Sequence, residues 1–85
     1  MYNIWFCEII EMNQNKINGL CYEKLLYKDI KENELLDYAK YICNDYGVNF
    51  IKIEENKYVR FNHPYQDKEN EINKNYCFFF EELCD

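Results

Sequence analysis

The chain is short, acidic and rich in aromatic residues. Its 85 residues carry sixteen acidic and ten basic side chains, for a formal net charge of −6. This length predicts one small domain over residues 1–85, and the dispersal of the ten basic residues among sixteen acidic ones argues against direct binding of DNA or RNA. Aromatic residues make up 19% of the chain, enough for a core because each buries about 150–250 Å².

The first predicted element is a strand over residues 2–12. Apolar residues occupy both of its faces, with Ile4 on one face and Trp5 on the other. A strand that is apolar on both faces is typical of the centre of a sheet. The polar cluster at residues 13–16 then predicts a turn.

Residues 20–28 fit two structures. Leu20, Tyr22 and Leu26 share one face of a strand, whereas Tyr22, Leu25 and Leu26 also fit a helical stripe. We expect a strand that returns antiparallel to the first one, after a bend or bulge at Gly19.

The clearest predicted element is a helix over about residues 33–46. Asn33 is a favoured N-cap residue, and Gly47 is the residue expected just beyond the end of the helix. The apolar positions between them form one stripe, which we expect to pack in the core: Leu35, Leu36, Ala39, Ile42, Cys43 and Tyr46.

Two further strands are predicted over residues 48–54 and 57–62. Apolar and polar residues alternate in both, so one shared apolar face requires Ile53 opposite Val59. This register puts Glu54 opposite Tyr58 and leaves a three-residue loop, which is a permitted hairpin length.

A polar loop is predicted over residues 62–75, followed by a last strand over residues 76–80 and an acidic end. The order is strand, strand, helix, strand, strand, strand. This order predicts an α+β fold, in which an antiparallel sheet of four to five strands carries one helix packed on one face.

No residue pattern points to catalysis, a cofactor or a metal. The five cysteines lack a C-x-x-C spacing, whereas structural zinc usually needs close pairs of Cys or His ligands. The single histidine, His63, lies beside Pro64 in the polar loop and is expected to be solvated. We therefore predict buried free thiols, no catalytic residue and no enzymatic activity.

The expected location is the cytoplasm. The first residues have no basic region and no long apolar run of the kind found in signal peptides. The longest apolar block, residues 76–80, is too short to span a bilayer, so no membrane partner is expected.

The negative charge is concentrated in the last third of the chain. Residues 61–85 contain six acidic and two basic residues, a net charge of −4. Carboxylates spaced along a loop and a strand end can imitate phosphates on a basic surface, and tyrosines can anchor such a contact. The predicted partner-binding residues are Tyr65, Asp67, Glu69, Glu71, Tyr76, Glu81, Glu82 and Asp85. The other interpretation is a solvated surface that keeps a small protein soluble.

In size, acidity and its stretch Asp67-Lys68-Glu69-Asn70-Glu71, the chain resembles small phage-encoded inhibitors of host defence, including anti-CRISPR proteins. The resemblance implies a non-enzymatic inhibitor or decoy. Such a protein would bind a basic nucleic-acid-binding surface of a host defence nuclease complex in the host cytosol. These inhibitors share no common fold, so the resemblance implies nothing about the fold. The alternative is a self-associating structural or adaptor module, a homodimer formed through a sheet edge or exposed aromatics.

Overall fold

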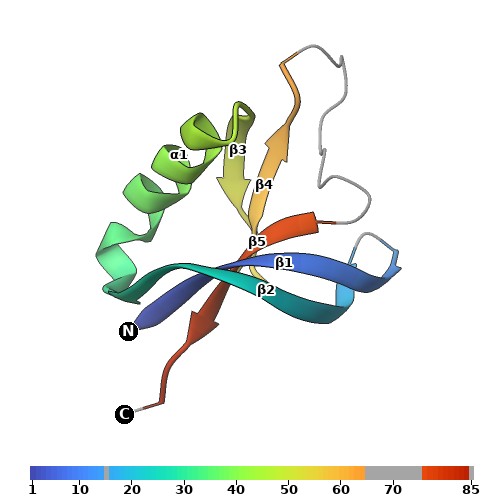
Figure 1. Cartoon of the computed structure of the whole chain (residues 1–85), viewed down its shortest axis with the longest axis horizontal. Coiled ribbons are helices and arrows are strands. Elements are labelled where there is room, and N and C mark those ends of the chain that lie inside the picture. Colours follow the sequence, from blue (N-terminus) through green and yellow to red (C-terminus); the bar gives the residue numbers. More distant parts are fainter. Residues whose placement is uncertain (15, 65–75, 85) are drawn as a thin grey trace.

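The strands and the helix follow one another in the predicted order. The computed structural model describes residues 1–14, 16–64 and 76–84. The fold is α+β with antiparallel sheets (Figure 1). Its elements are β1 (Tyr2–Asn13), β2 (Lys16–Ile30), a short 3-10 turn η1 (Glu32–Glu34), α1 (Leu35–Asp45), β3 (Asn49–Ile53), β4 (Val59–Asn62) and β5 (Tyr76–Glu82).

The strands form two sheets, so the expectation of one sheet of four to five strands is wrong. One sheet has the order β2-β1-β5, and β3 pairs with β4 in a second sheet. The hairpin of β3 and β4 meets β5 at its tip, where Tyr58 faces Phe79 in an isolated bridge. Beside it, the Phe80 N–H donates to the Lys57 carbonyl at 2.7 Å. Beyond this contact β4 leads away from β5, so the ladder does not continue (Figure 1).

β1 is the central strand of the larger sheet, as its two apolar faces predicted. It pairs antiparallel with β2 on one side and with β5 on the other. Ile4 lies in the core beneath the helix, whereas Cys7 and Ile9 belong to a second buried cluster. Side chains alternate along a strand, so these clusters occupy opposite faces of the sheet.

Residues 20–28 lie in β2, which confirms the expected antiparallel strand. β2 is longer than predicted, and Asn13 opposite Lys16 closes the hairpin with β1. Gly19 lies within the strand, opposite Glu11 and next to an irregularity in the register. Several such irregularities interrupt the ladder, which is why simple alternation left this segment ambiguous.

The helix begins differently from the prediction. The turn η1 precedes it, so Asn33 lies inside that turn and is not the N-cap. The Glu34 carboxylate accepts a hydrogen bond from the Lys31 N–H at 3.2 Å, which supplies the local cap instead. At the other end Gly47 has a φ of +70°, which confirms it as the residue that ends the helix.

Most of the predicted helical stripe packs in the core. Leu35, Ala39, Ile42 and Cys43 are buried, whereas Leu36 lies at the exposed edge of the stripe. The core beneath α1 consists of Tyr2, Ile4, Ile30, Leu35, Ala39, Ile42, Cys43, Val59, Phe61, Phe78 and Phe80. Tyr46, the last predicted member, is also largely exposed.

The predicted register of the second hairpin is confirmed. Ile53 is opposite Val59, and the Glu54 N–H donates to the Tyr58 carbonyl at 2.9 Å. The turn closes with a hydrogen bond from the Lys57 N–H to the Glu54 carbonyl at 2.9 Å. Lys57 adopts a φ of +61°, a left-handed conformation that completes the three-residue loop.

All five cysteines are free thiols, but two of them are exposed, which corrects the expectation that they are buried. Cys7, Cys43 and Cys77 are buried, and Cys21 and Cys84 lie at the surface. Burial raises the pKa of Cys43 to about 11. Cys77 lies opposite Cys7, and the hydrogen bond between them, together with burial, raises the pKa of Cys77. The thiols of Cys43 and Cys77 therefore stay protonated.

A thiol reagent is expected to separate these two groups. In the folded protein at mildly alkaline pH it should modify Cys21 and Cys84, because these two thiols are exposed and the three buried thiols are shielded from the reagent. After denaturation all five should react. Mass spectrometry counts the labels, and a disulfide in protein from a reducing lysate, or stoichiometric zinc, would contradict this assignment.

Candidate binding surface opposite the helix

Three of the eight predicted partner-binding residues lie in the described part of the chain. Tyr76, Glu81 and Glu82 all belong to β5. The remaining five, Tyr65, Asp67, Glu69, Glu71 and Asp85, lie outside the described residues, as does most of the predicted loop over 62–75.

β5 keeps Tyr76 apart from the two glutamates. Tyr76 begins the strand opposite Glu8, whereas Glu81 and Glu82 end it. Because successive side chains point to opposite faces, Glu82 lies on the side of the helix and Glu81 on the other side. The three residues therefore do not form one cluster.

Tyr76 belongs to a stack of rings on the helix side. Phe6 lies between Tyr46 and Tyr76, with ring centroids 5.6 and 5.1 Å away and interplanar angles of 18° and 11°. The stack borders a small apolar cleft of about 180 Å³. His63 lines the same cleft and is half-buried, edge-on to Phe61 with centroids 6.1 Å apart. The expectation of a solvated histidine holds only in part, because one edge of the ring faces an aromatic neighbour while the side chain keeps some exposure.

Glu81 is held on the opposite face by two hydrogen-bond donors. The Trp5 indole Nε1–H donates to its Oε1 at 3.0 Å, and the Asn3 side-chain amide donates to the same oxygen at 3.3 Å. Asn3 and Trp5 are two residues apart on β1 and therefore share a face. This arrangement fixes a half-buried carboxylate beside the single tryptophan of the chain.

Three aromatic rings continue from Glu81 across this face, one from each strand of the sheet. We call Trp5, Tyr22 and Phe79 the aromatic strip. The rings of Trp5 and Tyr22 have centroids 5.0 Å apart at 32°, and those of Tyr22 and Phe79 are 6.0 Å apart at 39°. Tyr22 is 42% exposed, so solvent or a ligand reaches its ring.

A bulge in β2 gives Tyr22 an apolar neighbour on this face. Leu25 is paired with Trp5 and Tyr22 with Cys7, although Tyr22 and Leu25 are three residues apart. Trp5 and Cys7 share a face of β1, so their partners share it as well. Strict alternation would place Tyr22 and Leu25 on opposite faces, which is why the sequence pattern did not reveal this surface.

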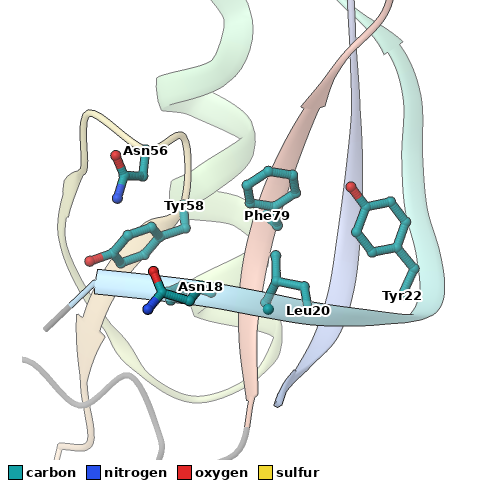
Figure 2. A pocket seen from close by; sticks show the side chains of 8 residues that line it. Asn18, Leu20, Tyr22, Asn56, Tyr58 and Phe79 are labelled. Carbon is teal, nitrogen blue, oxygen red and sulfur yellow. The ribbon is translucent and has the colours of Figure 1, made fainter. Parts of the chain in front are cut away.

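A groove adjoins the aromatic strip, between β2 and the tip of the second hairpin. It has a volume of about 400 Å³. In Figure 2, Asn56 and Tyr58 lie at the hairpin end, Leu20 and Phe79 in the middle and Tyr22 at the far end. The buried cluster that contains Tyr58 packs beneath it and fixes its shape.

The charge of Glu81 acts on the aromatic strip. Burial raises the pKa of Tyr22, and the negative charge of Glu81 raises it further. The phenol of Tyr22 therefore stays neutral, and the strip lies in a negative field. An aromatic face in a negative field favours a cationic ligand group.

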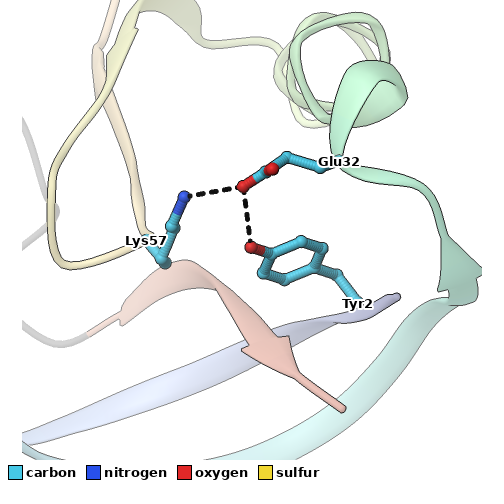
Figure 3. Close-up of polar contacts among 3 residues, drawn as sticks. All are labelled: Tyr2, Glu32 and Lys57. Carbon is cyan, nitrogen blue, oxygen red and sulfur yellow. Dashed lines mark hydrogen bonds and ion pairs between the residues drawn. The ribbon is translucent and has the colours of Figure 1, made fainter. Parts of the chain in front are cut away.

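A polar network holds the hairpin tip that closes the groove. The Tyr2 hydroxyl donates to Glu32 Oε1 at 3.0 Å, and Lys57 Nζ lies 3.4 Å from the same oxygen (Figure 3). The hydrogen bond from Tyr2, followed by that from Lys57, lowers the pKa of Glu32. The network joins β1, the turn before α1 and the hairpin, and so ties the hairpin tip to the first strand and to the start of the helix.

Residues 1–14, 16–64 and 76–84 contain neither a cluster of metal ligands nor a helix that could span a membrane. Within these ranges, no group of three or more His, Cys, Asp or Glu side chains is placed to hold a metal ion. The helices of the same ranges are too short or too polar to cross a membrane.

Comparison with models of known families, with curated proteins and with solved structures found no match for this chain, so no residue role is carried over from another protein.

Proposed function

We propose that this protein is a non-enzymatic binding protein that occupies a basic, nucleic-acid-binding surface of another protein. The observation that carries the proposal is the carboxylate of Glu81, which Trp5 and Asn3 fix at one end of the aromatic strip, whose Tyr22 ring is exposed. Opposite charges steer association and select the partner, and tyrosine and tryptophan are favoured contact residues at interfaces. The net charge of −6 acts in the same direction.

The partner that we favour is a host defence nuclease complex of the CRISPR type. The protein would then be encoded by a phage or mobile element and would act as a decoy in the host cytoplasm. The support is the resemblance to phage inhibitors in size, acidity and the stretch Asp67-Lys68-Glu69-Asn70-Glu71. Such a decoy needs no cofactor, because carboxylates take the place of phosphates on the basic surface.

A homodimer is the second candidate, and it is favoured by the side of β2 that pairs with no other strand in the described part of the chain. This strand of 15 residues lies at the edge of the three-stranded sheet and exposes Tyr22 and Leu25. Exposed edges pair with other strands, but bulges protect an edge, and β2 has several. Because of these bulges we place the dimer second.

The acidic stretch of the predicted loop gives the first test. Changing Asp67 to Asn and Glu69 and Glu71 to Gln should slow association with a basic partner captured from a host lysate, because three steering charges are lost. The fold should persist, since the polar sequence predicts exposed positions and such changes shift stability by about 0.5 kcal/mol. Association rates measured by surface plasmon resonance at several salt concentrations report the effect.

The same segment offers a control in which the charge changes in the opposite direction. Changing Lys68 and Lys74 to Gln should speed association, because it makes the segment more negative. The wild-type rate should fall steeply as salt rises, whereas an apolar dimer should respond little. If the acidic triple variant associates at the wild-type rate in low salt, the decoy mechanism is wrong and the homodimer becomes the better explanation.

A further inference from the structure

We propose that Glu81 and the aromatic strip bind an arginine side chain of the partner, carried on an extended segment that continues into the groove. This inference rests on the proposed function and names the chemical group that the protein recognises.

The carboxylate of Glu81 has capacity for an external cation. Both donors from this chain, Trp5 and Asn3, bond to Oε1, which leaves Oε2 directed to neither of them. In the described part of the chain, the ion pairs join Lys52 and Arg60 to Glu54 and join Lys57 to Glu32, and none involves Glu81. Glu81 is therefore a fixed negative charge without a cationic partner among the described residues.

The aromatic strip favours arginine over other cations. A guanidinium is planar, so it can stack on a ring such as that of Tyr22 while its N–H groups reach a carboxylate. Lysine presents a compact, strongly hydrated charge and gains less from such a surface. A hydrogen bond between two charged groups is also about twice as strong as one between neutral groups. Carboxylate and ring together thus match a guanidinium.

The groove can bind the extended peptide segment that carries the arginine. Asn18 on β2 and Asn56 on the hairpin are exposed and line it, and their amides can donate to and accept from a peptide backbone. Leu20 and Phe79 supply an apolar floor between these amides and Tyr22 (Figure 2). A peptide lying along this line would place one end at the amides and the other beside Trp5 and Glu81.

Trp5 allows the site to be tested directly, because it is the single tryptophan of the chain. The probe is an acetylated and amidated peptide of alternating glycine and arginine, compared at equal ionic strength with the same peptide carrying lysine or citrulline. Citrulline keeps the shape of arginine and removes its charge. The arginine peptide should change Trp5 fluorescence saturably. The citrulline peptide should bind more weakly by a factor of about ten or more.

Neighbouring glutamates provide a matched pair of variants. Glu81→Gln keeps an oxygen that accepts from Trp5 and Asn3 but removes the charge, so binding of the arginine peptide should fall about tenfold. Glu82→Gln removes the same charge on the opposite face and should change binding by less than about twofold. Tyr22→Leu, at an exposed position, should also weaken binding and should abolish the preference for arginine over lysine.

Several results would overturn the arginine site. Equal losses in the Glu81 and Glu82 variants, or equal binding of citrulline, would mean that general charge attraction accounts for the effect. A Trp5 signal that changes with protein concentration in the absence of peptide would mean that a second copy occupies this face. If the arginine peptide fails while the acidic loop variant still slows association with a protein partner, the arginine site is wrong and the proposed function stands.

Discussion

Replacing Ile42 with Asp is expected to unfold the protein. Ile42 lies on α1 and is 1% exposed, within the core that the helix shares with the three-stranded sheet. The variant would bury an unpaired carboxylate, which costs several kcal/mol, a large part of the total stability of a small domain. Circular dichroism should show loss of the folded signal at room temperature or a much lower melting temperature.

Leu36→Asp is the matched control for this change. Leu36 lies on the same helix but is 47% exposed, so the same substitution should shift stability by about 0.5 kcal/mol. An Ile42 variant that melts like the wild type, or a Leu36 variant that unfolds, would contradict the orientation of the helix on the sheet.

Phe80→Ala is expected to give the second large loss, about 3–5 kcal/mol by urea denaturation. Phe80 is 1% exposed and packs beneath the helix, so its removal leaves a cavity in the core. Phe79 is the neighbouring residue on the opposite face and is half-buried, so Phe79→Ala should cost less stability. It should, however, weaken binding of the arginine peptide, because it removes part of the aromatic strip.

These two variants separate the core from the candidate site. The expected pattern is large destabilisation by Phe80→Ala and a binding defect with modest destabilisation by Phe79→Ala. The reverse pattern would mean that β5 presents its other face to the helix.

The features of the fold that depend on local patterns could be predicted from the sequence. The spacing from Leu35 to Cys43 defines a helix face, and the alternation around Ile53 and Val59 fixes a hairpin register. The division into two sheets could not be predicted in this way. It depends on where the tip of one hairpin meets β5, at Tyr58 and Phe79, and local periodicity does not specify contacts between distant segments.

The candidate site shows the same limit. The acidic end of the sequence predicted Glu81 as a binding residue, but no pattern predicted Trp5 or Tyr22. These two residues lie on other strands, and strand pairing together with a bulge brings them to Glu81 and Phe79. One signal was present in the sequence. The apolar residues on both faces of the first strand indicated that other elements pack against each face of the sheet. The second hairpin covers part of the face opposite the helix through Tyr58 and leaves the ring of Tyr22 exposed.

The most direct test follows the indole N–H of Trp5 in a two-dimensional proton–nitrogen NMR spectrum during titration with the glycine–arginine peptide. If the acidic, aromatic face binds a cationic protein segment, this signal should shift saturably at low salt. The shift should weaken as salt rises and be largely lost in Glu81→Gln, because the indole hydrogen-bonds to the carboxylate that would pair with the guanidinium. An indole signal that stays in place while the peptide binds elsewhere, or that shifts equally in Glu81→Gln, would contradict binding at this face.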